Sequence, residues 1–272
     1  MTKGVIYYNI GQSCAVRLLI SILSLKKFYN GDITIISEGD ESHILCDKIA
    51  SATNAYVKKI KFDITDKENY PYLAKTRLNE VTPYDYSVFV DADTLITGTI
   101  DELFTDSPFV VTRMSEWSTN GSKIYRRIKN WNKICPDLVE KALVYGYAIN
   151  TGIFAFDKNA PIFNEWYSLT LKNRESFIPD EISCQLLITK YQHKLMDCRF
   201  NYSCKYGPLI DDIRIIHFHG RKHCRPGLPF NGHKWIEFYN KVVESNIADI
   251  KAWQPAGDRM LRKHLERSRQ IH

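Results

Sequence analysis

The sequence predicts an α/β fold built on one mainly parallel sheet flanked by helices. Short runs of β-branched and aromatic residues alternate along the chain with stretches of helical length, as in repeated strand–helix–strand units. The run 86–90 is almost wholly apolar or aromatic, which is typical of a strand covered on both faces. The chain has 272 residues, 44% of them hydrophobic, which is enough for one large core. No internal repeat or low-complexity segment interrupts the pattern, so we predict a single domain.

The first part of the chain alternates strands and helices up to residue 90. Asn30-Gly31 is a turn signal that ends the first helix. Pro83 ends the third helix, because the residue before a proline disfavours helical geometry. The predicted strands cover 5–8, 33–37, 55–60 and 86–90, and the predicted helices cover 15–28, 42–53 and 73–81.

After residue 100 the pattern loosens. Segment 115–145 contains interleaved polar, basic and aromatic residues. We predict that it is an insertion with a helix at 137–144. Pro179 and the two acids after it begin a helix that runs to about residue 190, because proline and acids are favoured at a helix N-terminus. The remaining predicted strands are 153–156 and 213–219, the folded domain covers 1–250, and a basic tail covers 251–272.

The charge is modest, and half of it lies in residues 258–272 within the tail. The chain has 37 Lys+Arg against 31 Asp+Glu, a formal net charge of +6. A basic tail on a nearly balanced domain argues against nucleic acid as a partner. It favours at most a weak peripheral contact with an anionic membrane surface, and a merely solvated end is the alternative. The tail holds Arg259, Arg262, Lys263, Arg267 and Arg269 against Asp258 and Glu266.

The sequence contains neither a visible secretory signal nor a membrane span. The longest apolar stretch, 15–25, is interrupted by Arg17 and is shorter than the roughly 20 residues that a span needs. The first residues contain no basic region followed by a long apolar one. The seven cysteines are odd in number and form no C-x-x-C pair, which favours reduced thiols. We therefore predict a cytoplasmic protein.

An Asp-x-Asp triplet, Asp91-Ala92-Asp93, directly follows the apolar strand 86–90. In open α/β sheets, ligands bind at the carboxyl ends of the strands. Two carboxylates at such a position need a cation or several hydrogen bonds to offset their desolvation. Oxygen ligands of this kind suit Mg²⁺ or Mn²⁺, ions that often also bind phosphate oxygens. The alternative is that one of the two aspartates caps the following turn.

His217 and His219 alternate along the last predicted strand, so both point to one face. One imidazole could be a third metal ligand, with Gly220 allowing backbone to approach a phosphate. The alternative is a pair of histidines whose hydrogen bonds are satisfied at a strand edge. A zinc site is also conceivable, although its spacing matches no finger or ribbon, and its candidate ligands are Cys204, His217, His219, His223 and Cys224.

Together these residues resemble the donor-site motifs of glycosyltransferase family 8, the glycogenin and bacterial galactosyltransferase group. Each motif is weak singly, but four of them occur in the family's order and, with the amino-terminal strand, span most of residues 4–222. The four motifs are Lys75 with Asp91-Ala92-Asp93 and 100–104, then Ile149-Asn150-Thr151-Gly152-Ile153-Phe154, then Pro179-Asp180-Glu181, then Ile216-His217-Phe218-His219-Gly220.

The resemblance implies a GT-A fold, a nucleotide-sugar donor and retention of anomeric configuration. The donor is expected to be a UDP-hexose, UDP-glucose or UDP-galactose, and the cofactor Mn²⁺ or Mg²⁺. Asp91, Asp93 and His217 are expected to hold the metal on the diphosphate. Asp180, Asp91 and Asp93 are the expected catalytic residues.

The resemblance also implies which residues bind the donor. Lys75 is expected near the phosphates and the sugar, and Asp180 is expected to hydrogen-bond the sugar hydroxyls. We expect the segment 115–145 on the acceptor side, because its interleaved aromatic and basic residues suit an acceptor, and the alternative is an ordinary covering helix with a solvated face. The acceptor, a glycan, protein or lipid-linked group, is left open. The full donor-binding set is Tyr8, Asn9, Lys75, Ala92, Asn150, Thr151, Gly152, Asp180, Glu181, Gly220 and Lys222.

The function expected from these observations is a metal-dependent retaining hexosyltransferase. One alternative is a nucleotidyltransferase acting on sugar phosphates, although the loop 9–13 has one glycine and no lysine. The other is a basic nucleic-acid-binding module. Two features depart from the family pattern: His223 occupies the usual lysine position after Gly220, and Cys14 occupies a commonly aromatic one.

Overall fold

The computed structural model describes residues 1–11, 14–66, 70–118, 128–203 and 212–218. It confirms the α/β fold with a mostly parallel central sheet flanked by helices. Seven strands form this sheet in the hydrogen-bonded order β3-β2-β1-β4-β7-β6-β8, and a smaller sheet has the order β5-β10-β9. The strands are β1 Lys3–Ile10, β2 Asp32–Glu38, β3 Tyr56–Ile60, β4 Tyr86–Val90, β5 Thr94–Ile96, β6 Phe109–Ser118, β7 Tyr147–Asp157, β8 Lys194–Met196, β9 Tyr202–Ser203 and β10 Ile215–His217.

The described residues divide into two compact units. Unit 1 contains Met1–Gly4, Lys61–Phe89 and Glu102–Asn201; unit 2 contains Val5–Ile60, Val90–Asp101 and the described residues from Tyr202 on. The helices are α1 Ala15–Leu25, α2 Asp40–Thr53, α3 Tyr70–Lys75, α4 Leu78–Val81, α6 Pro136–Tyr145, α7 Phe163–Lys172 and α8 Pro179–Leu187, with short 3-10 turns η1 Asp101–Leu103, η2 Lys129–Lys133, η3 Ile188–Lys190 and η4 Cys198–Asn201.

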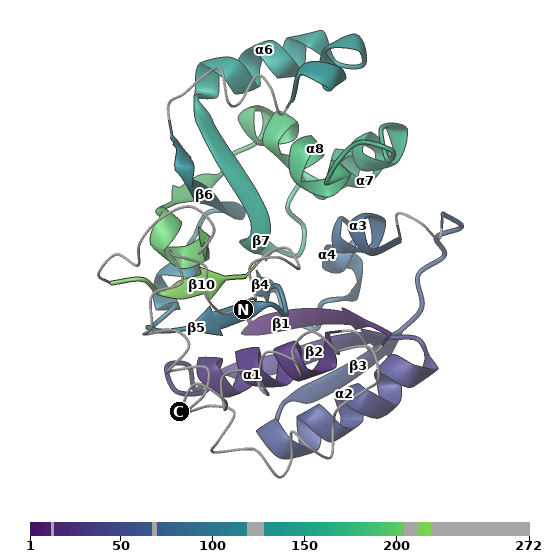
Figure 1. Cartoon of the computed structure of the whole chain (residues 1–272), viewed down its shortest axis with the longest axis vertical. Helices are drawn as coiled ribbons and strands as arrows, with labels where there is room; N and C mark the ends of the chain where they lie inside the picture. The colour runs from purple at the N-terminus through teal and green to yellow at the C-terminus, as the bar shows by residue number, and fades with distance from the viewer. Residues whose placement is uncertain (12–13, 67–69, 119–127, 204–211, 219–272) are drawn as a thin grey trace, which may run out of the picture. The chain divides into compact units, whose positions relative to one another are not determined.

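In unit 2, α1 and α2 lie beside strands β1, β2 and β3 (Figure 1). β2 and β3 pair in parallel, with Thr34 opposite Tyr56. The apolar face of α1 is fully buried, and a chain of hydroxyl groups ties the helix to both sheets. The Tyr7 hydroxyl lies 3.0 Å from Ser21 Oγ, which lies 2.7 Å from Thr94 Oγ1. These buried hydrogen bonds fix the start of β5 against α1.

The smaller sheet brings the end of the described chain next to the Asp-x-Asp turn. β10 pairs antiparallel with β5, which sets His217 opposite Thr94, and in parallel with β9. The predicted strand 213–219 is therefore confirmed over residues 215–217.

In unit 1, β6 pairs antiparallel with β7 and in parallel with β8. Helix α8 packs beside β7, and α6 and α7 both contact α8 (Figure 1). Aromatic rings from the strands and α7 form the core, with neighbouring ring centroids 5.0 to 5.9 Å apart. Such packing gives the unit its rigidity. The rings belong to Phe109, Phe154, Phe156, Phe163 and Trp166.

The predicted helix 73–81 is wrong as a single element, since the structure has two short helices, α3 and α4. At the break, the Thr76 hydroxyl donates to the Leu73 carbonyl at 2.7 Å, and the Thr76 and Arg77 amides bond to carbonyls three residues back. Side-chain hydrogen bonding of this kind competes with the α-helical pattern. The break makes Lys75 the last residue of α3, directly before the turn at Thr76 and Arg77.

Within segment 115–145, the structure describes the end of β6, η2 and the predicted helix, which is α6. Residues 119–127 and the basic tail 251–272 lie outside the described residues. No helix in the described part of the chain is both long and apolar enough to cross a membrane. The five cysteines that the structure describes are free thiols.

Candidate active site

Asp91, Asp93 and His217 form a compact group in unit 2. One ligand atom from each residue lies within 4.8 Å of the others. His217 Nε2 is 3.1 Å from Asp93 Oδ1 and 3.7 Å from Asp91 Oδ2. The imidazole is almost fully buried, whereas about a quarter of each aspartate side chain is exposed. The structure thus brings together the three metal ligands that the sequence predicts.

Backbone hydrogen bonds fix this group from both sides. Asp91 follows the last residue of β4, and its carbonyl accepts the Thr94 hydroxyl at 2.8 Å. The amide of Phe218 donates to the Asp93 carbonyl at 2.8 Å, which anchors β10 to the turn beside His217. Ala92 lies half-buried between the two aspartates. The carboxylates are therefore presented by a turn that is held on either side.

The chemistry of this group fits a divalent cation. Two carboxylates so close together repel each other unless a proton or a cation lies between them. Carboxylate oxygens suit Mg²⁺ and Mn²⁺, and the added imidazole nitrogen suits a transition metal such as Mn²⁺. The exposed edges of the aspartates leave positions for oxygen ligands from outside the protein.

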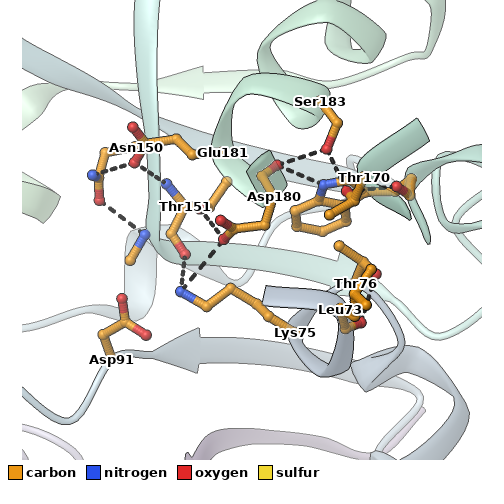
Figure 2. Close-up of polar contacts among 12 residues, drawn as sticks. Leu73, Lys75, Thr76, Asp91, Asn150, Thr151, Thr170, Asp180, Glu181 and Ser183 are labelled. Carbon is orange, nitrogen blue, oxygen red and sulfur yellow. Dashed lines mark hydrogen bonds and ion pairs between the residues drawn. The ribbon is translucent and has the colours of Figure 1, made fainter. Parts of the chain in front are cut away.

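A second polar group lies in unit 1 and contains five of the predicted donor-binding residues (Figure 2). Asp180, 4% exposed, accepts a hydrogen bond from Thr151 Oγ1 at 3.1 Å and lies 3.9 Å from Lys75 Nζ. Lys75 Nζ also donates to the Thr151 carbonyl at 3.4 Å and lies 5.0 Å from the centre of the Phe89 ring. Asn150 and Glu181 complete the group.

Asn150 is held by hydrogen bonds on both sides of its side-chain amide. Its nitrogen donates to Glu181, which is buried and also accepts the Thr151 amide at 3.4 Å. Its oxygen accepts the Gly152 amide at 2.8 Å and Asn201 Nδ2 at 2.9 Å. Asn201 is absent from the predicted site because its neighbours in sequence carry no motif, and only the fold brings it here.

Trp166 and Ser183 fix the first turn of α8. The Trp166 indole donates to the Asp180 carbonyl at 2.8 Å, and the Ser183 hydroxyl donates to the same oxygen at 3.0 Å. Ile178, just before the helix, has φ 45° and ψ 62°. The left-handed region is strained for a branched side chain, and such strain occurs often at functional sites. Asp180 and Glu181 thus follow a strained backbone residue that the surrounding contacts hold in this conformation.

The charges of this group act on a neighbouring tyrosine. Burial raises the pKa of Tyr72, the negative charge of Asp180 raises it further, and Lys75 opposes the rise. Tyr72 is 37% exposed, and it reaches the surface beside the polar group. Burial also raises the pKa of the Cys184 thiol well above its usual value, so that this cysteine of α8 stays protonated.

Lys75→Met is expected to destabilise the protein by roughly 2–3 kcal/mol, because it leaves the buried Asp180 carboxylate without its ammonium partner. The double variant Lys75→Met with Asp180→Asn is expected to lose less stability than Lys75→Met alone, because the two residues interact. Urea unfolding measures the free energy of unfolding of these two variants and of a control. The matched control is Lys59→Met, which breaks an exposed ion pair with Asp47. A loss from Lys75→Met no larger than that of the control would contradict the expectation.

Tyr8 and Asn9 lie at the end of β1 in unit 2. The Tyr8 hydroxyl donates to Glu38 Oε2 at 2.7 Å. Asn9 Nδ2 contacts Ser42 Oγ at 2.7 Å and the Gly11 carbonyl at 3.1 Å. Asn9 Oδ1 is buried and accepts no hydrogen bond from the described residues. A buried acceptor without a hydrogen bond is uncommon in a folded protein.

Several predicted residues lie outside the described residues. Gly220 and Lys222, expected to close over the diphosphate, are among them, and so is His219. The zinc alternative also depends on such residues, because Cys204, His223 and Cys224 are not described.

Solved glycosyltransferases share this fold, although no family model and no curated protein sequence matches the chain. The galactosyltransferase LgtC, solved with donor and acceptor sugar analogues, is 13% identical, covering 89% of this chain and 95% of its own, with a TM-score of 0.60. An active-site mutant of LgtC is 12% identical over the same shares, with a TM-score of 0.58. Mouse xyloside xylosyltransferase 1, in its apo form, is 10% identical, covering 80% of this chain and 97% of its own, with a TM-score of 0.55. At these identities the likeness establishes the fold, and the chain has the GT-A fold.

Proposed function

We propose that this chain is a metal-dependent retaining glycosyltransferase that moves a hexose from a nucleotide diphosphate sugar to an acceptor hydroxyl. The observation that carries the proposal is the group of Asp91, Asp93 and His217. The GT-A fold shared with solved galactosyl- and xylosyltransferases supports it, as does the order of the four family 8 motifs. The proposed donor is UDP-glucose or UDP-galactose.

In this proposal Asp91, Asp93 and His217 hold Mn²⁺ or Mg²⁺. The ion would supply electrostatic stabilisation of the diphosphate that leaves when the sugar–phosphate bond breaks. The three side chains would hold the ion, and the His217 imidazole among them is almost fully buried. No carboxylic acid is then needed to protonate the leaving group, in contrast to the two-carboxylate arrangement of glycoside hydrolases.

We propose that the polar group of unit 1 binds the transferred sugar. The Asp180 carboxylate accepts a hydrogen bond from a sugar hydroxyl, and its negative charge steadies the oxocarbenium-like transition state. Lys75 limits the cost of burying that carboxylate. In a retaining reaction, the departing phosphate oxygen takes the acceptor proton on the same face. The remaining proposed donor contacts come from Tyr8, Asn9, Ala92, Asn150, Thr151, Gly152, Glu181, Gly220 and Lys222.

A thermal-shift panel tests the donor-site assignment. UDP, GDP, ADP, CDP and CMP are each added with Mn²⁺, Mg²⁺ or EDTA. A ligand that binds only the folded state stabilises it by roughly 2.7 kcal/mol at a hundredfold excess over its Kd, so a real site gives a clear shift. We expect one nucleoside diphosphate to raise the midpoint only with metal. A nucleotide response that ignores metal would contradict the proposal.

We propose a weak peripheral contact of the basic tail with anionic membranes, and a cytoplasmic location. The tail lies outside the described residues, and the proposal rests on its charge. We expect the full chain to float with phosphatidylserine vesicles at low salt, and a chain ending at Gly257 to float less. If both chains stayed in the soluble fraction, the tail would have no role at membranes.

A further inference from the structure

Asn201 ends η4 in unit 1 and is 2% exposed. Its Nδ2 lies 2.8 Å from Thr112 Oγ1, 2.9 Å from Asn150 Oδ1 and 3.2 Å from the Asn150 carbonyl oxygen. Thr112 is also fully buried, and its hydroxyl donates toward the Ile153 carbonyl at 3.0 Å. Asn201 is therefore closed off from any ligand, and it acts through Asn150.

The contacts of Asn150 fix which way its amide faces. A carboxamide offers two acceptor and two donor positions. Both acceptor positions of Oδ1 are filled, by the Gly152 amide and by Asn201 Nδ2, and one N–H is taken by Glu181. Turning the amide over would set its NH₂ against two donors and its oxygen against a carboxylate. The network therefore permits one orientation.

One N–H of Asn150 is left without a protein partner among the described residues. Asn150 is half-buried, in contrast to the fully buried Asn201, so this N–H can meet a ligand. A hydroxyl oxygen is the acceptor that it fits. One residue further along β7, Thr151 contacts the Asp180 carboxylate, which can accept from a hydroxyl hydrogen. The pair of groups suits a neutral polyhydroxyl ligand.

On the basis of the proposed function, we propose that Asn201 is a positioning residue that holds the Asn150 amide oxygen inward, so that a single N–H donates to a hydroxyl oxygen of the transferred sugar. In this proposal Asn201 acts on Asn150 and not on the nucleotide. A substitution of Asn201 therefore weakens binding of the sugar part of the donor and leaves binding of the nucleoside diphosphate part unchanged.

Asn201→Asp tests this, because it keeps the shape and replaces the donor that faces Asn150 Oδ1 with an acceptor. The probes are UDP, and whichever of UDP-glucose and UDP-galactose the wild type binds more tightly, each with Mn²⁺. We expect affinity for UDP within about twofold of wild type and a loss of about tenfold or more in affinity for the UDP-sugar and in kcat/KM. Asn164→Asp, the same change on the exposed face of α7, is the control and should alter neither.

A double-mutant cycle with Asn150→Ala distinguishes a positioning role of Asn201 from a general disturbance of the structure. If Asn201 works through Asn150, Asn201→Asp costs little more once Asn150 is alanine. Additive losses, or equal losses for UDP and the UDP-sugar, would overturn the inference. If Asn201→Asp does not fold, Asn201→Ser is measured in the same way. A wild type that binds no nucleotide with metal would refute the proposed function itself. A wild type that binds both probes, with an unchanged ratio in the Asn201 variants, would refute only this inference.

Discussion

Replacing Asp91 and Asp93 together by asparagine is expected to remove metal-dependent nucleotide binding and to lower transferase activity by about a thousandfold. Stabilisation of a leaving diphosphate by a bound ion contributes several kcal/mol, and each 1.36 kcal/mol is a factor of ten in rate. In EDTA the variant should be at least as stable as the wild type, because the repulsion between the two carboxylates is gone. Thermal shifts with UDP and Mn²⁺ measure both effects.

The control for this experiment is Asp101→Asn, which removes an exposed carboxylate from η1 in the same unit. It should leave the metal response unchanged. If the Asp91 and Asp93 variant kept a normal Mn²⁺-dependent shift, the group with His217 would not be the metal site. The likeness to glycosyltransferases would then describe the fold alone.

Asp180→Asn is expected to lower kcat by roughly a hundredfold while affinity for UDP stays within a few-fold of wild type. The asparagine can still accept the Thr151 hydroxyl, so the first turn of α8 keeps its hydrogen bonds. The variant loses the negative charge of Asp180. Removal of one electrostatic group from an active site lowers kcat by about 10²–10³. Steady-state kinetics with a UDP-hexose, together with UDP titration, separate the two quantities.

Asp137→Asn on α6 is the matched control, because it removes an exposed carboxylate from the same unit. Normal turnover by Asp180→Asn would exclude a chemical role for Asp180. A parallel loss of UDP affinity would indicate instead that the substitution disturbs more than the sugar contact.

The group of Asp91, Asp93 and His217 is the part of the candidate site that the sequence predicts best. Asp91 and Asp93 follow a run whose apolar composition identifies a buried strand, and that strand is β4. His217 follows from a second β-branched run, and the pairing of β10 with β5 is what brings it to Asp93. Local composition thus predicts each ligand, while the distance between them depends on pairing across the fold.

Several other features of the structure are not predicted by the local sequence pattern. Asn201 lies in a short 3-10 turn, and its hydrogen bonds reach Thr112 and Asn150, far away in sequence. At the break between α3 and α4, the Thr76 hydroxyl bonds to the Leu73 carbonyl. Strand β6 and helix α7 are missing from the predicted elements, although Val110 and Val111 have strand composition, because the polar residues after them obscure the pattern.

The pairing of β5 with β10 also determines when Asp91, Asp93 and His217 can come together during synthesis. Asp93 and His217 are 124 positions apart, and the smaller sheet brings them together. During synthesis the two aspartates emerge long before the imidazole does, and contacts so distant in sequence form late in folding. A nascent or truncated copy that stops before residue 217 holds two of the three ligands. If the three residues bind Mn²⁺ as proposed, tight Mn²⁺ binding distinguishes complete chains from incomplete ones.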